Sequence, residues 1–153
     1  EFIFQVPGYN LRNNELNAVI GLNQLKRLDE NILKRNLNHS FFLKNIDKSK
    51  FYTEFKLEGS SNYAFNLILR NKDVKLMKSL INNLNKNNIE FRKGSAGGGN
   101  QLRQPYLKKI IKAKEYLKFI NTEHIHFFGM YIGNYPELKR KDILKICEVI
   151  NKS

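Results

Sequence analysis

The sequence lacks most of the features that identify a function at first sight. It contains a single cysteine among its 153 residues, so the chain cannot form an internal disulfide. No apolar run approaches the ~20 residues that are needed to cross a bilayer. The Gly-x-Gly-x-x-Gly and Walker patterns of nucleotide-binding folds are also absent. We therefore expect neither a membrane span nor a self-contained nucleotide-binding fold.

Patterns for catalysis and metal binding are equally sparse. His124 and His126 would share one side of a strand, but no third ligand is obvious and Glu123 would point the other way. A packing role is the favoured interpretation for both histidines, and we predict no metal site. No serine, histidine and aspartate arrangement can be argued from order or spacing. Cys147 stands in a helical stripe of isoleucines, which predicts a buried thiol and is typical of a reducing, cytoplasmic setting.

The sequence does contain a large excess of positive charge. Its formal net charge is +13, from 27 lysines and arginines against 14 aspartates and glutamates. The lysines are spread along the whole chain, which disfavours a nucleic-acid interface built on one basic face. The charge remains compatible with small phosphorylated ligands. Hydrophobic residues make up 41% of the chain and include eleven phenylalanines, which is enough for the core of one domain.

The hydrophobic pattern predicts helices and strands in alternation. A long helix is expected from about residue 13 or 14 to about residue 44. The other predicted helices follow Asp73, run from Pro105 to about residue 117 and occupy residues 138–150. The predicted strands occupy residues 53–57, 63–69, 89–91 and 127–132. This order is that of an α/β (α+β) layer, in which helices cover one face of a small sheet of three or four strands.

The strongest local signal is a stretch rich in glycine and positive charge at residues 92–105. Glycines expose backbone N–H groups that can surround an anion. Arg92 and Arg103 add forked donors for phosphate or carboxylate. Asn100, Gln101 and Gln104 can hydrogen-bond to hydroxyl groups. The alternative is a surface loop that merely shares the basic bias of the chain, and the residues alone leave both interpretations open.

The first predicted helix has more apolar surface than a small sheet can bury. Val19, Ile20 and Leu22 together cover a wide part of its circumference. Ala18 and Gly21 allow another element to approach closely. We therefore expect an exposed apolar surface that docks on another domain or subunit, and self-association through this helix.

Three stretches of the sequence resemble one enzyme family. The segment GYNLRNNEL at residues 8–16, continued by AVIGLNQL at residues 18–25, resembles the G-Y-N-x-R-x-x-E-L…A-x-x-G-x-x-Q-L signature of the DegT/DnrJ/EryC1/StrS family. The loop at residues 91–105 is similar to the corresponding loop of one branch of that family, and residues 128–134 are similar to its late strand and turn. The family comprises pyridoxal-phosphate sugar aminotransferases and related sugar dehydratases.

The resemblance implies that this chain is the C-terminal part of a fold-type-I enzyme, with a long helix and a small, mainly antiparallel sheet. Residues 1–45 would form an interface segment and connecting helix, and residues 46–153 the small C-terminal α/β domain. The N-terminal cofactor domain would be absent, because only seven residues precede Gly8 of the signature. In the family, the lysine that binds pyridoxal phosphate lies upstream of the G-Y-N signature. No catalytic residue is therefore expected here, and the fragment alone should be inactive.

The resemblance also implies roles for individual residues. Asn10 would bind the cofactor phosphate of the partner subunit in a homodimer. Arg12 is expected to orient the same region or to contact substrate. Arg92, Asn100 and Arg103 would bind the diphosphate or sugar of a nucleoside-diphosphate keto-sugar.

Three functions remain open from the sequence. The first is transfer of an amino group from an amino acid donor, often glutamate, to a keto-sugar nucleotide for lipopolysaccharide or deoxyamino sugar biosynthesis. The second is a pyridoxal-phosphate-dependent 3-dehydration of a 4-keto-6-deoxy sugar, in which a histidine replaces the family's lysine. The third belongs to another class, a basic binding module for nucleic acid or acidic glycans.

Overall fold

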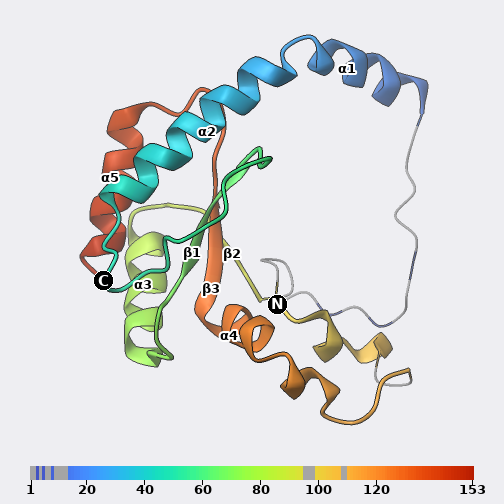
Figure 1. Cartoon of the computed structure of the whole chain (residues 1–153), viewed down its shortest axis with the longest axis vertical. Helices are drawn as coiled ribbons and strands as arrows, with labels where there is room; N and C mark the ends of the chain where they lie inside the picture. Colours follow the sequence, from blue (N-terminus) through green and yellow to red (C-terminus); the bar gives the residue numbers. More distant parts are fainter. Residues whose placement is uncertain (1–2, 4, 6–7, 9–13, 95–98, 108–109) are drawn as a thin grey trace.

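The computed structural model describes residues 3, 5, 8, 14–94, 99–107 and 110–153 of the chain. Two helices come first, and a small sheet with three further helices follows (Figure 1). In chain order the elements are α1 (Glu15–Leu25), α2 (Leu28–Asn45), β1 (Ala64–Ile68), α3 (Val74–Lys86), β2 (Arg92–Lys93), the 3₁₀ turns η2 (Gln101–Arg103), η3 (Pro105–Leu107) and η4 (Glu115–Lys118), α4 (Ile120–Phe128), β3 (Gly129–Gly133) and α5 (Arg140–Asn151). The predicted α/β class is confirmed.

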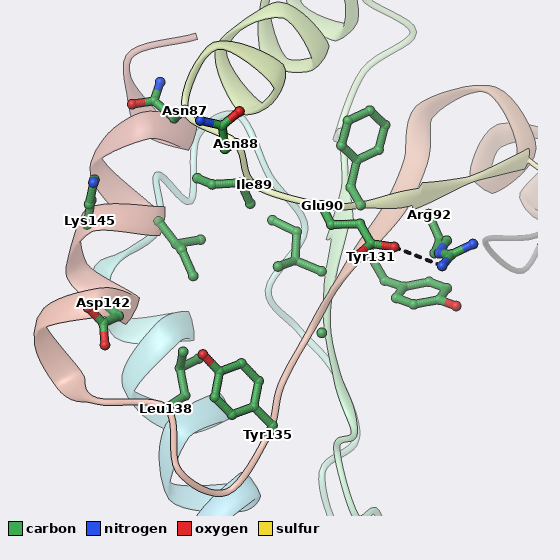
Figure 2. A pocket seen from close by; sticks show the side chains of 14 residues that line it. Asn87, Asn88, Ile89, Glu90, Arg92, Tyr131, Tyr135, Leu138, Asp142 and Lys145 are labelled. Atoms are coloured by element: carbon green, nitrogen blue, oxygen red, sulfur yellow. Dashed lines mark hydrogen bonds and ion pairs between the residues drawn. The ribbon is translucent and has the colours of Figure 1, made fainter.

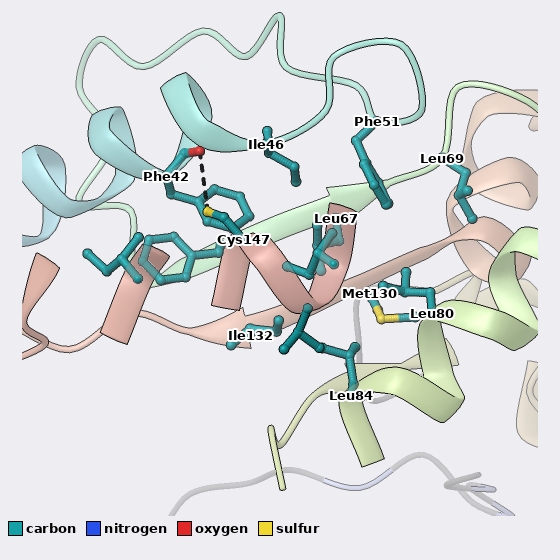
Figure 3. Packing of buried hydrophobic residues seen from close by; sticks show 14 of the residues in the cluster. Phe42, Ile46, Phe51, Leu67, Leu69, Leu80, Leu84, Met130, Ile132 and Cys147 are labelled. Atoms are coloured by element: carbon teal, nitrogen blue, oxygen red, sulfur yellow. Dashed lines mark hydrogen bonds between the residues drawn. The ribbon is translucent and has the colours of Figure 1, made fainter. Parts of the chain in front are cut away.

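The sheet has three antiparallel strands in the order β1-β3-β2. In its register Phe65 lies opposite Ile132, and Leu67 lies opposite Met130. Because side chains alternate along a strand, these four residues share one face of the sheet. That face is buried against α2, α3 and α5, as Figure 3 shows. The prediction of a small sheet with helices packed on one face is therefore correct.

Cys147 lies in the middle of this core. Its side chain is 2% exposed, and its Sγ contacts the backbone carbonyl of Phe42 at 3.9 Å. Burial raises the pKa of the Cys147 thiol to about 12. The thiol is therefore protonated at neutral pH and serves as a core side chain, as predicted.

The first predicted helix is in fact two helices, separated at Lys26 and Arg27. Helix α2 contributes His39 and Phe42 to the core, whereas α1 has no buried residue. The apolar side chains of α1 are each more than half exposed: Leu16, Val19, Ile20, Leu22 and Leu25. Figure 1 shows α1 projecting away from the sheet. Its apolar surface is exposed, as predicted. Within the described ranges no helix combines the length and apolar character that crossing a bilayer requires.

Four local predictions are wrong. Residues 53–57 form no strand, and only an isolated bridge joins Phe51 to Leu69 nearby. The strand expected at residues 89–91 begins at Arg92, after Asn88 turns the chain with a positive φ of 55°. In place of the helix expected from Pro105, the described residues form the short 3₁₀ turns η3 and η4, and Lys114, just before η4, has a left-handed φ of 62° that interrupts helical backbone at that point. The strand expected to carry His124 and His126 is helix α4 instead, whereas the strand predicted at residues 127–132 is present as β3 from Gly129 to Gly133.

His39 is the most unusual residue of the core. Its side chain is 1% exposed, and neither ring nitrogen has a hydrogen-bond partner among the described residues. The rings of Phe42, Phe55 and Phe65 surround it at centroid distances of 6.5, 6.2 and 6.1 Å. Burial lowers the pKa of His39 below its ordinary value of 6.5. A charged imidazolium would have neither water nor an acceptor in this place.

We predict that His39 makes the fold sensitive to mild acid. Since its pKa is lower in the folded chain, protonation favours the unfolded chain. The free energy of unfolding should therefore fall as the pH drops through about 6.5 toward the folded-state pKa. His39→Leu should lose less stability than wild type between about pH 7.5 and pH 5, measured by urea denaturation. If wild type and His39→Leu lose the same stability, the loss comes from groups that both proteins contain, such as the carboxylates. The assignment of the acid sensitivity to His39 would then be wrong.

Candidate functional site

The described part of the glycine-rich loop is closed against α4. The N–H of Gly99 donates to the carbonyl of Gly94 at 2.7 Å, which brings the two ends of the loop together. Residues 95–98, between them, lie outside the described residues. A Cβ on Gly99 would contact His126 Nδ1 and would lie 2.6 Å from backbone atoms of Gly94. The loop therefore requires glycine at this position so that the backbone can pass over the imidazole.

Asn100 fixes the loop through three groups at once. It is only 2% exposed. Its backbone N–H donates to His126 Nδ1 at 3.1 Å, and its side-chain amide donates to Glu123 Oε1 at 2.8 Å. Its side-chain oxygen accepts from the N–H of Leu102 at 3.0 Å, which caps η2. Asn100 therefore holds the end of the loop to α4.

Arg103 forms a two-pronged ion pair with Glu123. Its Nε donates to Glu123 Oε1 at 2.8 Å, and its Nη2 donates to the other carboxylate oxygen. The guanidinium lies over the rings of Tyr116 and Phe127, at 4.4 and 4.7 Å from their centroids. The hydrogen bond from Arg103 lowers the pKa of Glu123, so this carboxylate is ionised at neutral pH. The arrangement fixes the plane of the guanidinium.

The two histidines of α4 take part in separate structural hydrogen bonds. His126 is buried and accepts at Nδ1 from Asn100, which places its ring proton on Nε2. His124 Nε2 lies 2.6 Å from the carbonyl oxygen of Leu69. The predicted packing role is therefore confirmed, although the residues lie on a helix and not on a strand. No group of three or more histidine, cysteine or acidic residues that could hold a metal occurs in the described part of the chain.

Arg92 lies apart from the residues that are anchored on α4. It donates to Glu90 Oε1 at 2.8 Å and is about half exposed, at 49%. It lines an open cavity of about 520 Å³ beside Tyr131 of β3, as Figure 2 shows. Its neighbour Lys93 donates instead to the carbonyl of His126 at 3.4 Å. Successive side chains of a strand point in opposite directions, so β2 separates Arg92 from the α4 cluster.

The predicted substrate residues thus occupy two places. The structure brings Asn100 and Arg103 together on α4, and it places Arg92 in the cavity beside α5. Asn10 and Arg12 lie outside the described residues. Contact of any of these residues with cofactor or substrate stays a prediction.

The sequence did not reveal that Glu123 organises the cluster. One signal was available, because Glu115 and Glu123 are the only two carboxylates between Arg92 and Pro136. Glu115 pairs with Lys118 at 2.9 Å. Glu123 is therefore the carboxylate of this basic stretch that pairs with Arg103.

Comparison with known proteins gives the family. The DegT/DnrJ/EryC1/StrS aminotransferase family matches residues 1–151. The chain is 30% identical over 135 residues to a GDP-4-keto-6-deoxy-D-mannose 3-dehydratase from Escherichia coli O55:H7, a match that covers 88% of this chain and 34% of that protein. It is 34% identical over 65 residues to a UDP-4-amino-4,6-dideoxy-N-acetyl-beta-L-altrosamine transaminase from Campylobacter jejuni, covering 40% of this chain and 17% of the other.

A solved structure supports the same relationship. The E. coli GDP-4-keto-6-deoxy-D-mannose 3-dehydratase with bound hydrated pyridoxal phosphate superposes with a TM-score of 0.78 at 29% identity, over 97% of this chain and 38% of that one. This chain therefore spans little more than a third of the length of the two 3-dehydratases to which it was compared. The chain belongs to the DegT/DnrJ/EryC1/StrS aminotransferase family.

We predict that Glu123→Gln destabilises the fold by about 1.5–3 kcal/mol, because Arg103 would lose a charged acceptor in a partly buried place. Glu115→Gln, which weakens the exposed pair with Lys118, is the matched control and should change the free energy of unfolding by less than about 1 kcal/mol. Urea denaturation of both variants checks this. Equal effects of the two substitutions would show that the ion pair of Glu123 stabilises the fold no more than the exposed pair of Glu115.

A second prediction concerns the close passage of Gly99 over His126. Gly99→Ala should destabilise the chain by about 1–3 kcal/mol, since the added methyl group must displace the imidazole or the backbone of Gly94. Gly21→Ala serves as control, because no atom lies within 4 Å of a Cβ there. That helical substitution should be neutral or stabilising by up to about 1 kcal/mol. Thermal unfolding compares the two, and a neutral Gly99→Ala would contradict the described loop.

Proposed function

We propose that this chain is the C-terminal small domain of a pyridoxal-phosphate-dependent enzyme that acts on a nucleoside-diphosphate keto-sugar. Its reaction is transfer of an amino group from an amino acid to the sugar. The proposal is carried by the family match over residues 1–151, together with a fold that superposes on a family member over 97% of the chain. The transaminase from C. jejuni supports the reaction type by its name.

The second candidate is 3-dehydration of a 4-keto-6-deoxy sugar. One observation favours it: the relative matched over 88% of the chain and the solved structure reported above are both named 3-dehydratases. In the family, the residue that separates the two reactions lies upstream of the G-Y-N signature. The described residues are compatible with both reactions.

The described residues do not by themselves make up a covalent pyridoxal-phosphate site. Among the described lysines, only Lys50 and Lys93 are half-buried, and their ammonium groups donate to backbone carbonyls. When bound, the cofactor would supply the electron sink for chemistry at the sugar carbon. The expected contribution of this chain is Asn10 to the cofactor phosphate. We expect the chain alone to be inactive for this reason.

Asn100 and Arg103 would act on the substrate through the position of the loop, since both are already bound to α4. Arg92 has the more accessible guanidinium of the two arginines and would make the direct contact. Arg12 would complete the substrate contacts.

The proposal includes a homodimer in a reducing, cytoplasmic setting. The free, buried thiol of Cys147 suits such a setting. Residues 1–45 would be the interface segment and residues 46–153 the small domain, because the exposed apolar side chains of α1 need a cover that the described residues do not provide. This apolar surface favours a part of a larger enzyme over a basic module that acts alone.

The reaction is tested on the longer polypeptide that contains this chain. With pyridoxal phosphate, nitrogen-labelled glutamate and a GDP-4-keto-6-deoxy sugar, mass spectrometry should detect a sugar that has gained the labelled nitrogen. A sugar that has lost its oxygen at carbon 3 without gaining nitrogen would establish the second candidate. A folded protein that binds the cofactor yet does neither would overturn the proposal.

Arg92→Ala in the same polypeptide should weaken binding of the nucleotide sugar by about tenfold, the equivalent of one partly exposed charged hydrogen bond. Arg92→Lys should recover only part of the loss, because an ammonium cannot form a two-pronged contact. Arg70→Ala is the matched control, since Arg70 pairs with Glu54 in a similarly exposed place. If the Arg92 and Arg70 variants bind alike, Arg92 is not a substrate residue.

A further inference from the structure

Residues 53–61, which we call the strap, lie between the isolated bridge of Phe51 and the start of β1 and belong to no helix or strand. Their side chains alternate between half-buried and exposed. The half-buried ones include Thr53, Phe55 and Leu57, and the exposed ones include Glu54, Lys56 and Glu58. Within the described part of the chain, no backbone group of the strap is recorded in a hydrogen bond with another element. The strap is therefore held by its side chains.

Side chains attach the strap near its two ends. At the beginning, the carboxylate of Glu54 pairs with the guanidinium of Arg70, just after β1. At the end, the residue that follows the strap, Asn62, donates from its side chain to Asn36 on α2 at 2.9 Å. Residues 55–59, between these attachments, have no recorded polar contact with α2 or with the sheet, and all of them are described.

Phe55 is the residue of the strap that packs on His39. Its ring centroid lies 6.2 Å from that of the imidazole, in an edge-to-face arrangement. The other two rings around His39 belong to regular elements, since Phe42 is on α2 and Phe65 is on β1, and their centroids are 4.5 Å apart. Both of these rings are 0% exposed, whereas Phe55 is half-buried. Displacement of Phe55 therefore admits water to the imidazole at a lower cost than displacement of either other ring.

A protonated His39 has no acceptor while Phe55 stays in place. Both ring nitrogens are buried and have no hydrogen-bond partner among the described residues. Arg35, one turn earlier on α2, has a buried Nε that is likewise recorded without a partner, and its guanidinium is a donor that cannot accept from an imidazolium. Removing an imidazolium from water without an acceptor is strongly unfavourable.

The ionisable groups on the elements around His39 offer no replacement. Strand β1 carries none. From α5, the protonated thiol of Cys147 and the cation of Arg140 approach α2. The charged residues of the strap are exposed and alternate with its half-buried ones: Glu54, Lys56 and Glu58. Water is therefore the acceptor that a protonated imidazole requires, and the closed strap excludes it.

We propose that the strap is an acid-sensitive latch: protonation of His39 displaces Phe55 and lifts the strap from α2, while the helices and the sheet stay folded. Since Asn62 at the end of the strap also binds α2, opening weakens the attachment of α2 to the sheet. Helix α1 follows α2 in the fold with two residues between them, so its position would then respond to pH.

The sign of the response follows from burial. Burial lowers the pKa of His39 below its ordinary value of 6.5, so the closed strap favours the neutral imidazole. The closed state is therefore fully favoured above about pH 6.5 and is lost as the pH falls from that value toward the lowered pKa. This latch does not depend on the proposed reaction, and its failure would leave amino transfer to be judged by its own product.

Phe55→Trp supplies a single fluorescent reporter on the strap, because the 153-residue chain contains no tryptophan. The acrylamide quenching constant of this tryptophan should rise at least about threefold between about pH 7.5 and pH 5.5, with an unchanged far-UV circular dichroism spectrum. The same reporter in a His39→Leu background should show no rise. No rise with His39 present, an equal rise in both backgrounds, or a simultaneous loss of the circular dichroism signal would each overturn the proposal.

Leu144→Trp is the matched control, because Leu144 is a partly exposed apolar residue of α5, away from the strap in sequence. Its quenching constant should stay the same over this pH range. An equal rise at Leu144 would show that acid loosens the whole domain, and the assignment of a latch would be wrong.

The unmodified chain gives a second measurement that requires no tryptophan. By NMR, the ring resonance of His39, identified by its loss in His39→Leu, should titrate with a midpoint below about 6.5. The backbone amide resonances of residues 53–61 should shift with the same midpoint, while those of β1 and β3 keep their positions. A His39 that does not titrate in the folded chain, or that titrates without a response confined to the strap, would overturn the proposal.

Discussion

The carboxylate of Glu123 is the interaction on which the glycine-rich region depends. This stretch is strongly basic, and Arg103 and Asn100 both donate to the same carboxylate. Without it, the guanidinium, which lies over two aromatic rings, would lose its two-pronged acceptor, and the buried Asn100 amide would lose the nearer of two acceptors, at 2.8 Å against 3.3 Å for the carbonyl of Tyr116. The cost of leaving such groups unsatisfied exceeds the usual net value of one hydrogen bond. Glu123 thereby joins η2, η4 and the end of the loop to one turn of α4.

The sheet provides the frame for this arrangement. Strand β3 continues directly from α4 and pairs with both other strands, so the position of α4 is set by the central strand of the sheet. Strand β2 then sends Arg92 toward the cavity beside α5 and Lys93 to the opposite side, where it donates to the carbonyl of His126 on α4. The core on the helical face, with Phe65 and Leu67 against α2 and α5, holds this frame rigid.

Much of the frame could be predicted from the sequence, because strong periodicity and caps encode it. Asp73 caps α3 at Leu76 as expected, and the isoleucine stripe around Cys147 is buried. The family signature was recognisable for the same reason, since it is local in sequence. The turn at Lys114 could not be predicted, because no glycine or proline marks the left-handed backbone there. The ion pair of Glu123 joins residues that are 20 positions apart, and only the fold brings them together.

Helix α1 has a consequence for the energetics of assembly. An isolated helix of 11 residues is marginal in water, and tertiary packing normally supplies most of the stability of such a segment. No residue of α1 is buried, so packing adds little to the stability of this helix. The side chain of Asn14, which accepts from the N–H of Asn17, stabilises it locally. A surface that covers α1 would therefore also complete a coil-to-helix transition. The free energy of binding between that surface and α1 would equal the free energy of the contacts, reduced by the free energy required to order the helix. The enthalpy and heat-capacity changes of binding would be those of coupled folding and binding.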